Sequence, residues 1–203
     1  MTKEEYKNIR DLAWYILRET KVKKLPVNIV EVCAKLDVKV RSYDNDHNFA
    51  KNYKNGFSII LKNGDKVIFY NKAIKNKYRN RFTIAHELGH IMLGHNINNS
   101  DKEYKIMETE ANMFAIRILS PLCVLHEIKL DSAKELAEIC GLSKQASNIR
   151  FKNFEKAEME NKFYMDPKEI KLVMQFKNFI KNTKNKEISI INKASYKIRC
   201  FCF

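Results

Sequence analysis

The most constraining feature of this chain is a pair of histidines four residues apart within a largely apolar segment, residues 82–93. The ionisable members of this segment are His86, Glu87 and His90. On a helix, positions i and i+4 lie on one face, so both imidazoles can reach one tetrahedral metal ion at about 2.0–2.1 Å. Burying such groups is unfavourable unless a partner satisfies them. The pattern predicts a metal-binding helix over roughly residues 79–93.

Glu87 has a different position from the two histidines in this HExxH pattern. It lies too far round the helix to bind the same ion, but it can reach a water molecule that the ion holds. Zinc acidifies such a water, and a neighbouring carboxylate can take its proton and later deliver it to a leaving amine. The pattern therefore predicts Glu87 as the general base of a zinc peptidase. The alternative is a pair of core histidines with ordinary hydrogen bonds.

A catalytic zinc site needs a third protein ligand and an open position. The metzincin arrangement, with a third histidine six residues after the second, is excluded because His95 follows His90 by five residues and the required glycine is missing. The remaining option is an acidic residue on the next predicted helix, about residues 104–120. This helix offers Glu108 and Glu110.

The phase of that helix separates the two glutamates. At about 100° per residue, Glu108 shares a face with small residues that allow another helix to approach closely, whereas Glu110 lies about 200° further round. We therefore predict Glu108 as the third ligand and a surface ion pair between Glu110 and Arg117. Asn112, one turn beyond Glu108, could orient a ligating histidine or could be an ordinary polar group between helices.

Three tracts in this order resemble the ImmA/IrrE family of bacterial metallopeptidases. They are Arg79–His90, Glu108–Ala115 and Ile118–Pro121, with weaker similarity back to about residue 25 and forward to about residue 151. The resemblance implies a gluzincin-like zinc site whose ligand glutamate, on the second helix, matches Glu108. It also implies a protein substrate, namely a helix-turn-helix repressor of a phage, a mobile element or a stress response.

The hydrophobic pattern predicts helices around a small sheet, which is an α+β fold with zincin-like active-site helices and a C-terminal helical region. Besides the two helices above, helices are expected at residues 4–20 and 27–36, on both sides of Gly141, and at 148–161; strands are expected at 38–40, 56–61 and 67–70. The turn Asn63-Gly64-Asp65 joins the last two strands as a hairpin. Either of these strands could offer an edge to which a peptide substrate adds.

We expect three parts along the chain. Residues 1–130 form the zinc metallopeptidase core, residues 131–165 form a helical hairpin packed on it, and residues 166–203 form a basic C-terminal extension. A capping serine before each helix and Gly141 between them make the hairpin similar to a helix-turn-helix. It could contact DNA or a repressor, or it could simply cover the peptidase fold.

Positive charge is concentrated at the C-terminal end. Residues 168–203 carry nine lysines and arginines against two acids, which is half of the net charge of +14. Such a segment could make weak, salt-sensitive contacts with nucleic acid, although a solvated end is the plainer interpretation. We expect the extension to be dispensable for metal binding and for the protease fold.

Cysteine usage and the chain start bear on the compartment. The five cysteines are odd in number and lack a CxxC pair, so we expect reduced, mostly buried thiols: Cys33, Cys123, Cys140, Cys200 and Cys202. The charged start predicts no secretory signal, and the lack of an uncharged apolar run of about 18 residues predicts no transmembrane helix. A cytoplasmic location without a membrane partner follows.

These observations favour a zinc-dependent endopeptidase with one Zn²⁺ per chain that acts on a regulatory protein. The alternative is a metal-containing DNA-binding or scaffold regulator without proteolytic activity. Glu87 favours the enzyme, because a structural metal site needs no base. The residue that stabilises the transition state stays open among His95, Tyr104 and His126.

Overall fold

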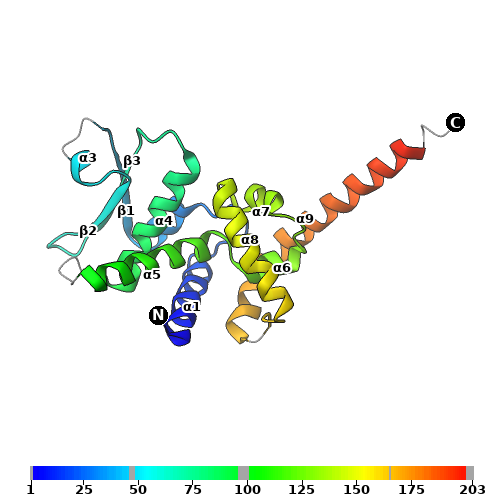
Figure 1. Cartoon of the computed structure of the whole chain (residues 1–203), viewed down its shortest axis with the longest axis horizontal. Helices are drawn as coiled ribbons and strands as arrows, with labels where there is room; N and C mark the ends of the chain where they lie inside the picture. The colour runs from blue at the N-terminus through cyan, green and yellow to red at the C-terminus, as the bar shows by residue number, and fades with distance from the viewer. Residues whose placement is uncertain (1, 46–48, 96–100, 165, 200–203) are drawn as a thin grey trace.

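The computed structural model describes residues 2–45, 49–95, 101–164 and 166–199, and it has the expected α+β fold (Figure 1). A small sheet lies at one end of the molecule, and the helices of the C-terminal half lie at the other. The strands are β1 (Val38–Tyr43), β2 (Gly56–Ile60) and β3 (Lys66–Asn71). The helices are α1 (Lys3–Glu19), α2 (Ile29–Lys35), α3 (Phe49–Asn52), α4 (Lys77–Leu93), α5 (Asp101–Leu119), α6 (Leu122–Ile128), α7 (Ala133–Cys140), α8 (Lys144–Met159) and α9 (Pro167–Arg199).

The sheet has the strand order β1-β3-β2. β1 runs parallel to β3, whereas β2 pairs antiparallel with β3 as the predicted hairpin. Gly64 makes the hairpin turn with φ of 86°, a left-handed conformation that glycine adopts without strain. Because β3 is central, the outer edge of β2 is unpaired among the strands that the structure describes, and α4 packs against both strands of the hairpin.

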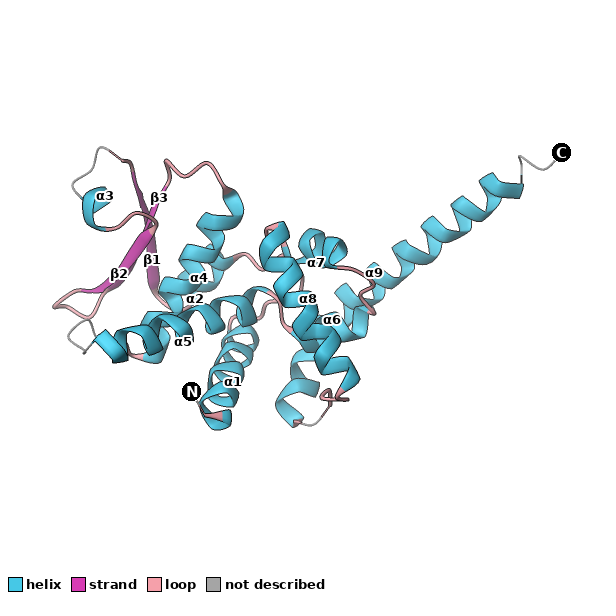
Figure 2. Ribbon diagram, in the orientation of Figure 1, coloured by secondary structure: helices cyan, strands magenta, loops and turns pink. Residues whose placement is uncertain are grey.

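The close packing of α4 against α5 depends on small residues at their contact (Figure 2). A Cβ atom added at Gly89 would lie 3.0 Å from the ring of Phe114 and 3.2 Å from Cα of Ala111. Ala111 and Phe114 are fully buried. The predicted face of small residues on α5 therefore meets α4, and this contact brings the two helices close enough to share one site.

Two arginines attach the α7–α8 hairpin to the helices of the core. Arg81 of α4 donates hydrogen bonds to the carbonyls of Val27, Cys140 and Gly141. Arg150 of α8 donates to the carbonyl and the hydroxyl of Ser120, just after α5. The hairpin thus covers the core, as one of the two interpretations expected.

The boundaries of the helices in this region differ from the expectation. α8 is one continuous helix from residue 144 to 159, where a short helix and a second one at residues 148–161 were expected. α6 was not predicted at all. Pro121 occupies the N-cap position of α6, so the proline that ends α5 also starts the next helix. The division into residues 1–130, 131–165 and 166–203 stays a prediction.

The first part of α9 belongs to the hydrophobic core, which argues against a dispensable extension, although dispensability itself stays a prediction. Leu172 and Phe176 are fully buried, and Ile180 is 7% exposed. α9 packs on α1 and α6, and Gln175 donates hydrogen bonds to the carbonyls of Leu17 and Val22. This packing was not predicted because these apolar residues, four apart, form a helical stripe between lysines that dominate the composition.

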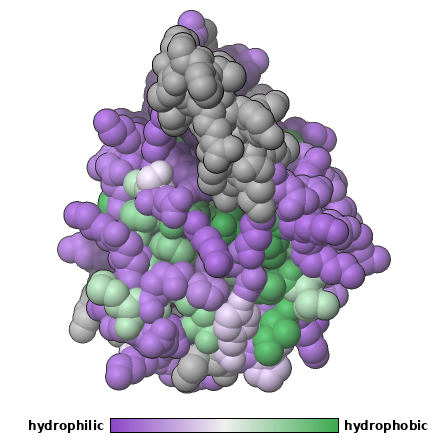
Figure 3. Space-filling view, turned by 90° about the vertical axis from the view of Figure 1, so that its right-hand side faces the viewer, coloured by the Kyte–Doolittle hydropathy of each residue, from purple (hydrophilic) through white to green (hydrophobic). Residues whose placement is uncertain are grey.

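The second part of α9 extends away from the rest of the molecule (Figure 1). Seen from that side, the surface is mostly hydrophilic, with smaller apolar patches between the polar residues (Figure 3). The basic extension therefore has two different parts, one packed on the core and one projecting from it.

One stretch of the described chain, Glu103–Ile128, is long and apolar enough to cross a membrane by length and composition alone. It spans two helices, α5 and α6, and 61% of its apolar window is buried inside the fold. Such burial is typical of core helices. The expectation of no transmembrane helix was based on a stricter criterion, an entirely uncharged run.

The cysteines that the structure describes agree with the expectation of buried thiols. Cys33, Cys123 and Cys140 are buried and free. Burial raises the pKa of Cys33 and of Cys140 to about 12, so neither forms a reactive thiolate near neutral pH. Cys200 and Cys202 lie outside the described residues.

Candidate metal centre

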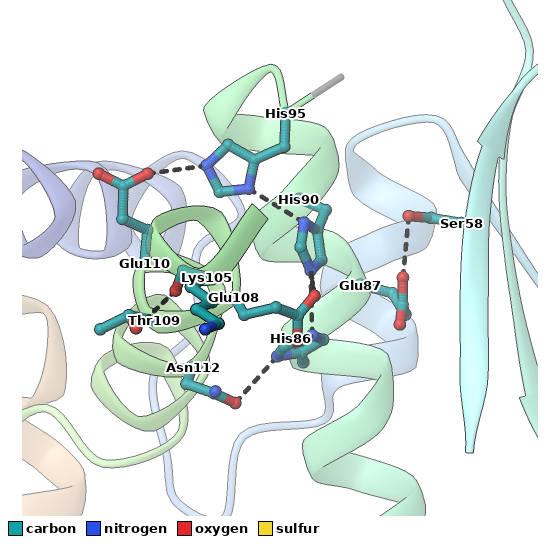
Figure 4. A network of polar contacts seen from close by, with 10 residues as sticks. All are labelled: Ser58, His86, Glu87, His90, His95, Lys105, Glu108, Thr109, Glu110 and Asn112. Atoms are coloured by element: carbon teal, nitrogen blue, oxygen red, sulfur yellow. Dashed lines mark hydrogen bonds and ion pairs between the residues drawn. The ribbon is translucent and has the colours of Figure 1, made fainter. Parts of the chain in front are cut away.

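α4 positions both histidines of the HExxH pattern on the side that faces α5 (Figure 4). The helix begins after Asn76, whose side chain accepts hydrogen bonds from the backbone N–H groups of Tyr78 and Arg79. Ala85 and Leu88 are fully buried and anchor the helix in the core. The predicted metal-binding helix is therefore held at its start by a cap and along its length by apolar packing.

The side chains of His86, His90 and Glu108 converge between α4 and α5. The two Nε2 atoms lie 3.0 Å apart, and the Glu108 carboxylate is 3.4 Å from Nε2 of His86 and 3.2 Å from Nε2 of His90. Ligand atoms at about 2.0–2.2 Å around a tetrahedral ion are separated by roughly 3.3–3.6 Å. These three residues can therefore hold one metal ion.

The chemistry of the three groups also fits a metal. Nδ1 of His86 lies 3.0 Å from Oδ1 of Asn112, so Nδ1 carries the proton and Nε2 presents its lone pair. Burial and the neighbouring His86 lower the pKa of His90 to about 4, which favours the neutral imidazole that binds metal ions. Two neutral imidazoles and a carboxylate form a ligand set that first-row transition metals bind.

Glu87 points away from the histidines towards the sheet (Figure 4). Ser58 of β2 donates a hydrogen bond of 2.9 Å to Oε2 of Glu87. Burial raises the pKa of Glu87 to about 7, against the opposing effect of the Ser58 hydrogen bond. A carboxyl group in this range can exchange a proton near neutral pH. Sequence reasoning missed Ser58, because one serine in a short strand has no distinguishing spacing.

A groove of about 430 Å³ runs beside these residues, between β2, α4 and α5. All five residues of β2 line it, together with Glu87, His90 and Glu108. Its other walls are mostly aromatic or aliphatic and include Tyr53, Ile91 and Met107. The groove therefore joins the metal-binding residues to an unpaired strand edge.

The structure separates the three candidates for transition-state stabilisation. Tyr104 lines the groove, and its hydroxyl is hydrogen-bonded to Glu108. His95 also lines the groove, but both of its ring nitrogens have partners. His126 lies elsewhere, with Nδ1 2.5 Å from Glu158 and its ring stacked on Phe163. His126 is therefore excluded from the groove.

The predicted ion pair between Glu110 and Arg117 is wrong. Glu110 instead lies 3.0 Å from Nε2 of His95, and the guanidinium of Arg117 lies over the ring of Tyr6. The reason is the end of α4, where Gly94 takes a left-handed conformation with φ of 70°. The chain turns back at Gly94, so that His95, which no longer follows the helical spacing of α4, meets α5.

Comparison with models of protein families shows a match. The model of the Peptidase_M78 family, described as an IrrE N-terminal-like domain, matches residues 33–152. The match includes α4 and α5, which carry the three converging side chains, and most of the α7–α8 hairpin, and it covers more than half of the chain. No curated protein matches the chain.

Proposed function

Because this chain belongs to the Peptidase_M78 family, the IrrE N-terminal-like metallopeptidases, we propose that it is a zinc-dependent endopeptidase. Its ligands for one zinc ion per chain are His86, His90 and Glu108. The observation that carries the proposal is the convergence of these three side chains next to Glu87, in a groove that follows an unpaired strand edge.

The ligand set, combined with the HExxH spacing on a helix, is typical of zinc peptidases. Catalytic zinc sites use three protein ligands, and two histidines with one glutamate are among the established combinations. Zinc bound here would lower the pKa of a water molecule to about 7 and polarise the carbonyl of the scissile bond. Because His90 and Glu108 line the groove, an ion held by these residues would be accessible to water and substrate.

Glu87 is the proposed general base and, later, the general acid. Ser58 holds Oε2, which leaves Oε1 to take the proton of the attacking water. The same carboxyl group then delivers this proton to the nitrogen of the leaving amine. Ser58 acts as a positioning residue, because its hydrogen bond fixes the orientation of the carboxylate.

Tyr104 is the proposed donor to the oxyanion that develops on the scissile carbonyl. Its side chain is 54% exposed within the groove, so substrate can reach the hydroxyl. The hydrogen bond to Glu108 places this hydroxyl beside the ligand atoms. His95 is less suited, since its side chain is only 8% exposed and substrate reaches it less easily.

The proposed substrate is a regulatory protein, specifically a helix-turn-helix repressor of a phage, a mobile element or a stress response, in the cytoplasm. The family supports a protein substrate, and the resemblance to ImmA/IrrE proteins supports a repressor. The β2 edge supports binding of an extended segment as an added strand, whereas β3 is central and has no such edge. The projecting part of the basic extension would add at most a weak, salt-sensitive contact with DNA.

The test uses the purified full chain and, as substrate, any helix-turn-helix repressor that is encoded next to its gene. Mass spectrometry should detect two complementary fragments of the repressor, and a chelator should abolish their formation. Glu87→Gln is the matched control, because it should retain zinc. A chain that binds stoichiometric zinc and binds the repressor but does not cleave it would instead support the regulator without proteolytic activity.

A further inference from the structure

Behind His90, on the side away from the converging ligand atoms, two further side chains form a continuous series (Figure 4). Nδ1 of His90 lies 3.0 Å from Nδ1 of His95. Nε2 of His95 in turn lies 3.0 Å from Oε2 of Glu110. The series therefore runs from the end of α4 through the following turn to α5.

The chemistry of these groups allows one arrangement of protons between neutral rings. The Glu110 carboxylate can only accept a hydrogen bond, so Nε2 of His95 must carry a proton. The neutral ring of His95 then presents a lone pair on Nδ1, and Nδ1 of His90 must donate to it. Nε2 of His90 is left with its lone pair, directed at His86 and Glu108.

The surroundings hold this series in place. The backbone N–H of His95 donates to the carbonyl of His90 at 3.0 Å, in the turn that Gly94 makes possible. The side chain of His95 is 8% exposed and that of Glu110 is 20% exposed. Both side chains are therefore largely buried, and the orientation of His95 is fixed from two sides.

We propose that His95 and Glu110 are positioning residues that hold His90 in its Nδ1-protonated tautomer, with Nε2 ready to bind the metal. Glu110 acts through His95, and His95 acts through His90. The inference rests on the proposed function only in taking His90 as a metal ligand. His95 cannot itself share the ion, because its near nitrogen faces Nδ1 of His90 and not Nε2.

The corresponding support for His86 is simpler. Its Nδ1 meets Oδ1 of Asn112 directly. α5 therefore supplies a ligand, Glu108, and the supports of both histidines, one direct and one through His95. Partners of this kind typically change metal affinity by about 10–100-fold when removed.

The first experiment measures zinc affinity by competition with a chromogenic chelator. His95→Phe keeps the ring shape without nitrogens and should weaken zinc binding by about 10–100-fold. Glu110→Ala should weaken zinc binding by the same factor or a smaller one. The double variant should bind zinc as tightly as His95→Phe alone, since Glu110 acts through His95. Glu138→Ala, which removes an exposed acid on α7, is the control and should bind like the wild type.

The second experiment reads the protons directly in the metal-free full chain. Two-bond ¹H–¹⁵N NMR spectra distinguish histidine tautomers, and they should show His95 protonated at Nε2. In Glu110→Ala this preference of His95 should weaken. Circular dichroism should show an unchanged fold, which separates positioning from loss of structure.

Two outcomes would overturn the inference. The first is an NMR spectrum that shows His95 protonated at Nδ1 in the wild type. The second is a loss of zinc affinity from Glu110→Ala that is as large in the His95→Phe background as in the wild-type background. Failure of the proposed function would look different. The wild type would then bind no zinc at all, while the tautomers of the metal-free chain would still decide whether the series exists.

Discussion

Nδ1 of His86 lies 3.0 Å from Oδ1 of Asn112, one helical turn beyond Glu108 on α5. Asn112 itself is exposed, so it contributes little to the packing between α4 and α5. This contact supports the interpretation of Asn112 as a partner that orients a ligating histidine, in preference to an ordinary interhelical polar group. Its effect on metal binding is therefore separable from its effect on stability.

Asn112→Ala should weaken zinc binding by about 10–100-fold while the melting temperature of the metal-free chain stays within a few degrees. Chelator competition and thermal unfolding check the two halves of this prediction. Thr109→Ala is a suitable control, since Thr109 is exposed on the same helix and its hydroxyl contacts only the Lys105 carbonyl in the described hydrogen bonds. Equal zinc affinity of Asn112→Ala and the wild type would contradict the orienting role.

Glu108→Gln should lose stoichiometric zinc after dialysis against a weak chelator, because a neutral amide replaces the charged ligand. Glu110→Gln should keep stoichiometric zinc under the same conditions, since Glu110 contacts the site only through His95. Mass spectrometry of the metal measures the zinc content of both variants. His86→Ala serves as the reference for a chain that has lost its metal site. The reverse result for the two glutamates would invalidate the argument from helical phase.

Glu87→Gln should fold, keep zinc and lose at least about a hundredfold in the rate of repressor cleavage, since the proton acceptor is gone. Ser58→Ala should also keep zinc, with a smaller loss in kcat than Glu87→Gln, because the base stays but its carboxylate is no longer held. Fragment formation followed over time gives both rates. Undiminished cleavage by Glu87→Gln would remove Glu87 as the base.

The HExxH helix and the convergence of Glu108 on its histidines could be predicted because both depend on local geometry. The spacing of His86 and His90 and the phase of Glu108 are properties of single helices, which a sequence displays directly. The contacts of Ser58 with Glu87 and of His95 with Glu110 were not predicted. They depend on how β2 packs beside α4 and on the left-handed turn at Gly94, and neither has a periodic signal.

Ion pairs between α1 and the start of α9 give the stability of the chain a dependence on pH. Asp11 contacts Lys168 and Arg10, each at 2.8 Å. Although burial opposes it, hydrogen bonds from Lys168 and Arg10 lower the pKa of Asp11 below 3.8. A carboxyl group with a lowered pKa stabilises the fold above its unfolded pKa, and this contribution is lost as the pH falls through the lower folded value.

Asp11→Asn should therefore reduce the free energy of unfolding at pH 7 by about 0.5–1 kcal/mol, the range for solvent-screened ion pairs. The difference from the wild type should shrink as the pH falls below 4 and as salt is raised. Urea unfolding at several pH values and at two salt concentrations measures it. A difference that persists at pH 2.5 and in high salt would point to packing as its cause.

Two truncations distinguish the packed part of α9 from the projecting part. A chain that ends at residue 185 keeps Leu172, Phe176 and Ile180, whose burial contributes about 1.5–3 kcal/mol for each side chain. Its melting temperature and zinc affinity should match those of the full chain.

A chain that ends at Asp166 loses this stripe and the Lys168–Asp11 ion pair, and it also exposes the surfaces of α1 and α6 that α9 covers. Since about 1 kcal/mol corresponds to roughly 2–4 °C at this size, its melting temperature should fall by about 10 °C or more. Equal melting temperatures for the two truncated chains would show that α9 adds no stability, and that residues 168–180 are dispensable after all.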